Sequence, residues 1–154
     1  MEKHKKEGRY QRIFKQLESL MAKSTDIHAR MATVIAVLHH KMEYYFWTGF
    51  YILGTDRELV VRSYQGPVAC QVLEKGKGVC WAGINRKETI VVEDVHQFPG
   101  HIACDSRSRS EIVVPFRNKQ GEIVGVLDVD SKNPGAFDEI DAKWLEKILK
   151  LIEI

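Results

Sequence analysis

At 154 residues, of which 44% are hydrophobic, the chain can bury one core of ordinary size and is short for two typical domains. Charged residues make up 29% and the formal net charge is only +2, which argues against the basic surface that nucleic-acid binding requires. No apolar run approaches the roughly 18 residues that cross a bilayer, and no apolar signal core follows the N-terminal charges. We therefore expect one cytoplasmic domain, residues 1–154, with neither a nucleic-acid nor a membrane partner.

The first forty residues carry two helical patterns. Apolar side chains recur at helical spacing over residues 10–21 and again over residues 27–38. Ser24, Thr25 or Asp26 can cap the second helix. Residues 1–40 are therefore predicted to form N-terminal helices without chemistry of their own.

From residue 44 onward the apolar pattern becomes that of strands. Short runs rich in Val, Ile, Tyr and Phe lie between turn residues at 47–53, 58–64, 69–74, 89–94, 111–117 and 122–130. A short helix is expected within residues 76–87, a long loop over 93–109, and a C-terminal helix after Asp138.

This order predicts an α+β fold with about six strands in a mostly antiparallel sheet and with the N- and C-terminal helices packed on it. Residues 44–154 would hold the sheet, an active-site loop and the C-terminal helix. The terminal helices either cover the same face of the sheet or supply a dimer contact.

Three carboxylates are predicted to share one face of a hairpin formed by the last two strands. Asp128 and Asp130 are two residues apart in a strand, so their side chains point to the same side. If residues 118–121 form the loop, Glu111 faces Asp128, whereas a slip of two residues places it opposite Asp130. Like charges in such positions require a ligand or a proton, unless the strand has left the core and its aspartates are solvated.

The sequence has three cysteines and no CxxC pair, which suits a reducing compartment. Cys104 follows a Pro-Gly turn and has His101, Arg107 and Arg109 within five residues, and such cationic neighbours favour a reactive thiolate. Cys80 lies near the start of the short helix, where the helix dipole would favour a thiolate too. The alternative is that these thiols and Cys70 are ordinary buried side chains.

A metal site is the weaker interpretation of the long loop. His96, His101 and Cys104 lie in it together, but their spacing matches no paired ligand motif. We expect no metal.

Two aromatic residues share a face of the first strand. Trp47 and Tyr51 are four residues apart, with Gly49 between them. They are either core aromatics or the walls of a small cavity over Gly49.

Five stretches of the chain together resemble one protein family. In order they are "FWTGFYIL", "YQGPVACQV", "GKGVCWAG", "VVEDVHQFPGHIACDSRSRSEIVVP" and "GEIVGVLDVDS", which reach from about Tyr44 to the C-terminus. They resemble the GAF-domain free methionine-(R)-sulfoxide reductases and include all three cysteines. The resemblance implies a single GAF-like domain that converts free L-methionine (R)-S-oxide to L-methionine. Thr48 departs from the larger apolar residue that many relatives carry there, a change not expected to alter the chemistry.

The resemblance also implies roles for individual residues. The nucleophile corresponds to Cys104, the resolving cysteine to Cys70, and Cys80 is a second or alternative resolver. Glu111 would help to protonate the sulfoxide oxygen. The substrate-binding residues correspond to Trp47, Tyr51, Glu111, Asp128 and Asp130.

The implied reaction needs no bound cofactor. Cys104 would become a sulfenic acid and then a disulfide, which an external dithiol such as thioredoxin reduces. Relatives are often dimers, so the resemblance also allows a homodimer. Two rival interpretations are a sensory or redox-switch GAF module and a structural metal domain, which predicts bound zinc and protected thiols.

Overall fold

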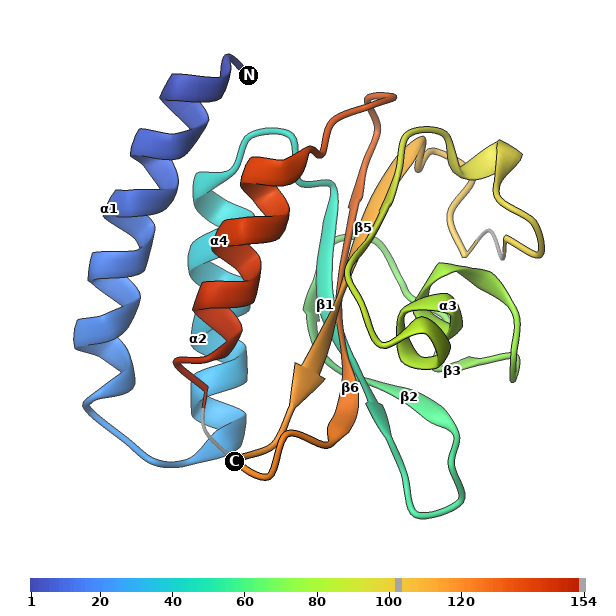
Figure 1. The fold of residues 1–154 in the computed structure, drawn as a ribbon, viewed down its shortest axis with the longest axis horizontal. Coiled ribbons are helices and arrows are strands. Elements are labelled where there is room, and N and C mark those ends of the chain that lie inside the picture. Colours follow the sequence, from blue (N-terminus) through green and yellow to red (C-terminus); the bar gives the residue numbers. More distant parts are fainter. Residues whose placement is uncertain (102–103, 153–154) are drawn as a thin grey trace.

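The computed structural model describes residues 1–101 and 104–152, which form helices on both sides of one sheet (Figure 1). The helices are α1 (Lys3–Met21), α2 (Ile27–Lys41), α3 (Gly78–Arg86) and α4 (Glu139–Leu149), with a short 3₁₀ helix at Val95–Gln97. The strands are β1 (Trp47–Leu53), β2 (Leu59–Gln65), β3 (Val72–Leu73), β4 (Ile90–Val92), β5 (Ser110–Arg117) and β6 (Ile123–Ser131). The predicted α+β class is therefore confirmed.

The strands lie in the order β3-β2-β1-β6-β5-β4, and every neighbouring pair is antiparallel. The two strands of the predicted hairpin, β5 and β6, occupy interior positions beside β4 and β1. Interior strands have both neighbours paired, so their side chains are held in a fixed register. This register positions the functional site.

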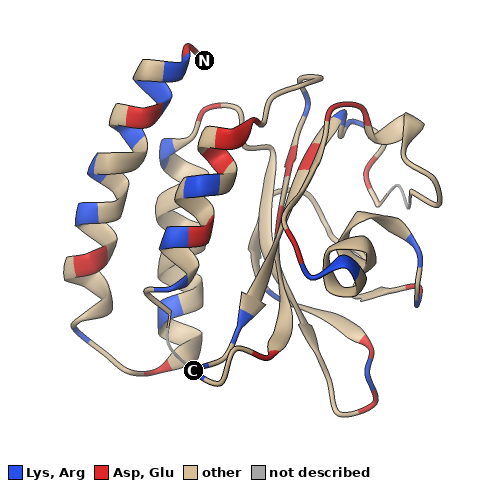
Figure 2. Ribbon diagram, in the orientation of Figure 1, with Lys and Arg blue, Asp and Glu red and all other residues tan. Residues whose placement is uncertain are grey.

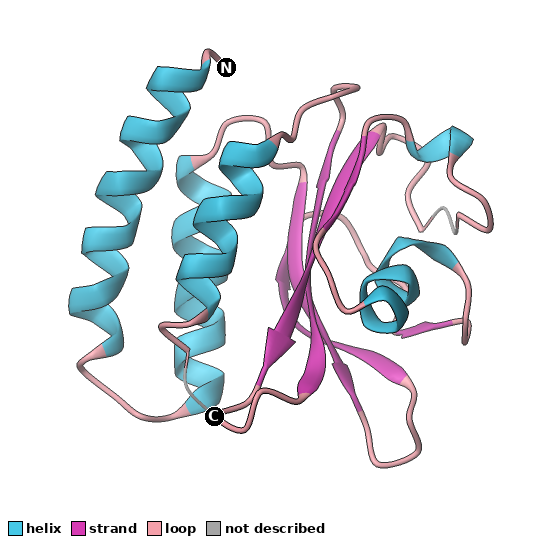
Figure 3. Ribbon diagram, viewed as in Figure 1, coloured by secondary structure: helices cyan, strands magenta, loops and turns pink. Residues whose placement is uncertain are grey.

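The sheet separates two unequal layers (Figures 1 and 3). Helices α2 and α4 contact the sheet on one face, and α1 packs on α2 and α4 from outside. Helix α3 and the loops around it cover the opposite face. Of the two alternatives for the terminal helices, the structure shows the first, since they lie on the same side of the sheet, with α1 packed mainly on the other two helices.

Alternation along β1 divides its side chains between these two layers. Phe50 faces the core under α1, α2 and α4, whereas Trp47 and Tyr51 belong to the core beneath α3. Thr48 also faces the helices, where its Oγ1 lies 3.0 Å from Nδ1 of His39. The one departure from the family pattern therefore lies on the face away from α3.

The helix ends follow the capping chemistry of the sequence. The Asp26 carboxylate accepts from the backbone N–H of Ala29, 2.8 Å away, and so caps α2. Asp138 caps α4 in a reciprocal capping box with Asp141. None of the helices within residues 1–101 and 104–152 is both long enough and apolar enough to span a bilayer.

A buried polar network fastens α1 to α4. The Lys6 ammonium lies 2.7 Å from Oδ2 of Asp141, and both side chains are buried. Oδ1 of Asp141 accepts hydrogen bonds from the hydroxyls of Tyr10, at 2.6 Å, and Tyr44, at 2.5 Å. Because every oxygen has a partner, the charge of Asp141 is compensated despite its burial.

Replacement of Asp141 by Asn should therefore lower the free energy of unfolding by about 3 kcal/mol, since it leaves the buried Lys6 ammonium without its charge partner. Lys3→Ala, which removes an exposed ion pair with Glu139, is the matched control and should leave stability unchanged. Denaturant unfolding monitored by circular dichroism measures both variants. Equal stabilities of Asp141→Asn and the wild type would contradict the role given to this network.

Candidate active site

A pocket lies between α3 and the face of the sheet that carries Trp47. Seven of the eight residues that the sequence singles out line it: Trp47, Tyr51, Cys80, Cys104, Glu111, Asp128 and Asp130. The eighth, Cys70, is joined to the pocket by a disulfide. Segments far apart in the sequence are thus brought together because β1, β5 and β6 are adjacent in the sheet.

The pairing of β5 with β6 places the three carboxylates on one face. Glu111 lies opposite Asp130, and Asp128 lies opposite Val113. Backbone hydrogen bonds close the turn over residues 118–121, while a register shift between Phe116 and Arg117 moves the pairing along. The loop over residues 118–121 is therefore that of the first alternative considered from the sequence. The pairing of Glu111 with Asp130 is that of the second alternative.

Two of these carboxylates are buried within the protein and the third is half-buried. Glu111 and Asp128 are each only 6% exposed, whereas Asp130 is of intermediate exposure. Figure 2 shows acidic segments on the strands of the sheet, apart from the charged positions that follow the helices and loops. No Lys or Arg among residues 1–101 and 104–152 forms an ion pair with Glu111, Asp128 or Asp130 within 4.0 Å. The interpretation of the aspartates as solvated side chains is therefore wrong for Asp128, whereas Asp130 is partly exposed.

Burial raises the pKa of all three carboxyl groups, because the charged form loses its water. The charges of Asp128 and Asp130 raise the pKa of Glu111 further. Hydrogen bonding from Glu111 and Cys80 opposes the effect of burial on the pKa of Asp128. The group therefore retains protons at a pH where exposed carboxylates have lost them, and Oδ1 of Asp128 is left buried without a hydrogen-bond partner in the described structure.

The structure pairs two of the three cysteines. Cys70, in the loop before β3, and Cys104, in the loop before β5, form a disulfide although 34 residues separate them in sequence. This is the pair that the resemblance implies. Cys104 is exposed, so its sulfur lies where the pocket opens to solvent.

Cys80 is a free thiol on the first turn of α3. It is 4% exposed, and burial, followed by the nearby charges of Asp128 and Glu111, raises its pKa. The expectation that the helix dipole favours a thiolate here is wrong, because desolvation and the acidic neighbours outweigh the dipole.

The loop around Cys104 is less cationic than the sequence suggests. The Arg107 guanidinium donates to both oxygens of Asp105, at 3.0 and 2.8 Å, and so lowers the pKa of Asp105 to about 2. Burial lowers the pKa of His101. Because Arg107 is neutralised by its partner and His101 favours the uncharged form, these two residues give Cys104 little of the expected positive charge.

The aromatic residues are both core side chains and pocket walls. The Trp47 ring stacks between those of Tyr51 and Tyr64, with centroid distances of 5.8 and 5.3 Å. The hydroxyl of Tyr51 donates to the carbonyl of Cys70 at 2.9 Å. The Trp47 ring covers Gly49, where a Cβ would collide with it, so the alternative of a cavity over this glycine is wrong, and the pocket that Trp47 and Tyr51 line does not include Gly49.

Sequence reasoning missed Tyr64 as a member of this stack. It pairs with Gly49 across β1 and β2, but strict alternation from the buried Leu59, five residues earlier, places Tyr64 on the opposite face of β2. The register shift between Gly49 and Tyr51 brings Tyr64 to the face of Trp47, so the sequence pattern carried no signal for it.

One group of potential metal ligands occurs among residues 1–101 and 104–152. It comprises Cys80, Glu111 and Asp128, whose ligand atoms lie within 4.8 Å of one another. A metal would require the thiol and the carboxyls to lose protons that burial makes them retain, so the cost of loading is high. The group includes neither His96 nor His101, so the ligand set considered from the sequence does not form.

The family model that matches the chain is that of the GAF domain, over residues 24–154. A GAF domain-containing protein A from Dictyostelium discoideum is 47% identical over 98% of this chain and 94% of its own length. The free methionine-R-sulfoxide reductase of Escherichia coli is 39% identical over 94% of this chain and 86% of its own length. The chain belongs to the GAF-domain free methionine-(R)-sulfoxide reductase family.

A solved structure of this family resembles the chain throughout. The free methionine-R-sulfoxide reductase of Neisseria meningitidis, determined in complex with its substrate, superposes with a TM-score of 0.89. It is 44% identical to this chain, and the match covers 94% of this chain and 86% of that one. The GAF fold expected from the sequence is therefore confirmed.

The buried carboxyls should make the stability of this GAF domain depend on pH. A carboxyl whose pKa is raised on folding binds more protons in the folded than in the unfolded state, so stability falls as the pH rises above the ordinary carboxyl pKa. In Glu111→Gln the free energy of unfolding should therefore fall less between pH 5 and pH 8 than in the wild type. Denaturant unfolding of the oxidised protein over that range measures it, and identical pH slopes for the variant and the wild type would contradict the burial of a protonated Glu111.

Proposed function

We propose that this protein reduces free L-methionine (R)-S-oxide to L-methionine, with Cys104 as nucleophile. The observation that carries the proposal is the pocket itself, in which a cysteine able to form a disulfide and three buried carboxyls meet. A sulfoxide sulfur becomes electrophilic only when its oxygen is protonated or strongly hydrogen-bonded. The raised pKa of Glu111 and of Asp130 leaves them able to supply that proton at neutral pH.

In the first step the Cys104 thiolate attacks the sulfoxide sulfur. An S–S bond forms while Glu111 and Asp130 protonate the oxygen, which leaves as water. A water molecule then attacks the Cys104 sulfur, so that the S–S bond breaks and Cys104 becomes a sulfenic acid. Methionine leaves with its sulfur reduced by two electrons, and Cys104 is oxidised by two electrons. The exposure of Cys104 at the mouth of the pocket suits attack on a bound substrate.

In the second step the Cys70 thiol attacks the sulfenic sulfur, water leaves, and the Cys70–Cys104 disulfide forms. An external dithiol of the thioredoxin type then returns both cysteines to thiols by exchange. The thiols supply all the electrons, so the reaction uses no bound cofactor. The disulfide in the structure supports this pairing as the resting oxidised state.

The remaining pocket residues would hold the free amino acid. Trp47, with Tyr51 behind it, would pack on the substrate methyl group. Asp128 would bind the ammonium, a role supported by its buried Oδ1, which has no hydrogen-bond partner among the described residues. A pocket that takes up the charged ends of an amino acid excludes the same residue within a protein chain.

Incubation of the reduced protein with each diastereomer of free methionine sulfoxide tests the function. Methionine should form from the R form and not from the S form, because only one places its oxygen at the carboxyls while its sulfur faces Cys104. Quantification of methionine by chromatography gives the rates. Absence of turnover of the R form with excess dithiothreitol would contradict the proposal.

Substitutions of the two paired cysteines test their roles. Cys104→Ser should lose methionine formation entirely, whereas Cys70→Ser should complete one turnover and then recycle poorly. Single-turnover and steady-state measurements on reduced protein separate these effects. A Cys104→Ser variant that retains the single-turnover rate would assign the nucleophile elsewhere.

A further inference from the structure

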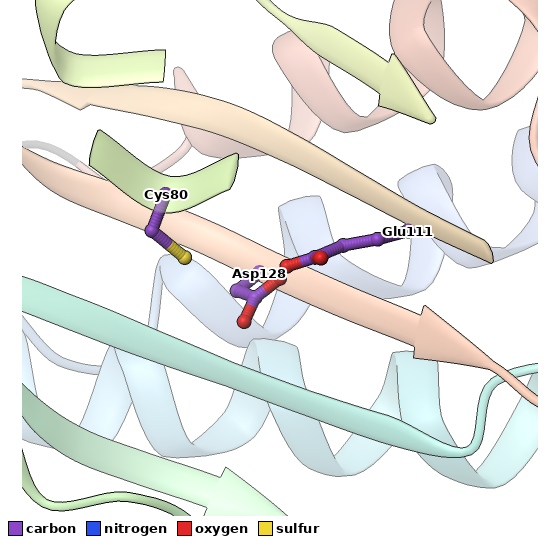
Figure 4. Close-up of side chains that lie close together, drawn as sticks. All are labelled: Cys80, Glu111 and Asp128. Carbon is purple, nitrogen blue, oxygen red and sulfur yellow. The ribbon is translucent and has the colours of Figure 1, made fainter. Parts of the chain in front are cut away.

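Cys80 is a buried pocket residue that the proposed reaction does not require. Its thiol lies outside the disulfide and beneath the first turn of α3. Figure 4 shows its sulfur directed toward Asp128, with the Glu111 carboxyl on the other side of Asp128. The three groups lie within 4.8 Å of one another, measured between the sulfur and one carboxyl oxygen of each acid.

This environment does not suit a resolving cysteine. A resolver must reach the Cys104 sulfur and act as a thiolate, whereas Cys80 is 4% exposed and its pKa is raised by burial and by the acids. Cys104 is already joined to Cys70. The thiol of Cys80 is instead held in its protonated form, in which it can act as a donor.

The carboxyl next to this thiol is the one best able to carry a negative charge. A carboxyl oxygen of Glu111 lies within 4.8 Å of one of Asp128, so that a charge on either acid disfavours a charge on the other, and a proton on Glu111 leaves Asp128 as the acceptor. Asp128 then receives donors from two sides, Glu111 on β5 and Cys80 on α3, and both lower its pKa. No corresponding donor offsets the burial of Glu111, whose neighbours Asp128 and Asp130 both raise its pKa.

We propose that Cys80 is a positioning residue whose thiol holds Asp128 as the ionised member of the group, so that Glu111 keeps the proton that it delivers to the sulfoxide oxygen. This inference rests on the proposed function for its consequence, since an ionised Asp128 would bind the substrate ammonium. A protonated Glu111 and an anionic Asp128 give one pocket both an acid and a counter-ion. The third cysteine thereby acts on proton placement rather than on electron transfer.

Other titratable groups also face Asp128 across the pocket. They come from β1, β6 and the loops, and they are Tyr51, Asp130, Lys77, His101, Cys104 and Asp105. Asp130 disfavours an anion at Asp128, and the Lys77 ammonium is paired with Glu74 at 3.0 Å. Neither changes when Cys80 is substituted, so a change in the titration of Asp128 reports on the thiol.

The test is an infrared titration of the carboxyl groups in the reduced, substrate-free protein, with Asp128→Asn used to assign the Asp128 band. Cys80→Ala removes the donor and should raise the apparent pKa of Asp128 by about one unit. Cys80→Ser keeps a hydroxyl donor and should retain most of the wild-type value. Both replacements are smaller than cysteine, so an effect of lost packing would move the two variants alike.

Single-turnover methionine formation across pH supplies the second measurement, because it does not depend on resolution or recycling. The acidic limb of the rate profile should move to higher pH in Cys80→Ala and return toward the wild type in Cys80→Ser. Unchanged titration in Cys80→Ala, or equal shifts in both variants, would overturn the inference. If the wild type formed no methionine the proposed function would fail, whereas the infrared titration would still decide the role of Cys80.

Discussion

The pairing of β5 with β6 is the constraint on which the site depends. It places Glu111, Asp128 and Asp130 on one face of interior strands, buries the first two, and gives the three no cationic partner within the described structure. A group of carboxyls in this position cannot ionise fully, because each charge would lose its water and repel its neighbours. The fold thereby keeps an acid protonated at a pH where a free carboxyl is ionised.

A second buried carboxylate in the same chain has partners that compensate its negative charge. Asp141 is completely buried, yet its oxygens accept from the Lys6 ammonium, two tyrosine hydroxyls and the backbone N–H of Asp138. Asp128 is nearly as buried, but its Oδ1 has no partner among the described residues. Burial with full compensation joins helices together, whereas burial without it leaves a site for a ligand. The two faces of the sheet differ in this respect, with compensated structural packing under α1, α2 and α4 and the candidate site under α3.

The extent of prediction from sequence differed from residue to residue. The period of two along β5 and β6 was sufficient to place three carboxylates on one face, because alternation is a property of any strand. It did not select the register, since the shift at Phe116 and Arg117 depends on how the turn meets the strands. Local charge suggested a thiolate at Cys104 and the helix dipole one at Cys80, but Arg107 is paired with Asp105 two residues away, and the burial of Cys80 depends on tertiary packing. The Trp47 ring over Gly49 likewise depends on β2, which supplies Tyr64.

The central claim is that a buried carboxyl of this group is protonated at neutral pH. Carbon-13 nuclear magnetic resonance of side-chain carboxyls, in reduced protein labelled at Asp and Glu, observes the protonation state of each group directly. The account predicts that the Glu111 resonance keeps the chemical shift of a neutral acid at pH 7, while those of exposed carboxylates titrate near their ordinary pKa. Fully ionised shifts for Glu111, Asp128 and Asp130 at pH 7 would contradict it.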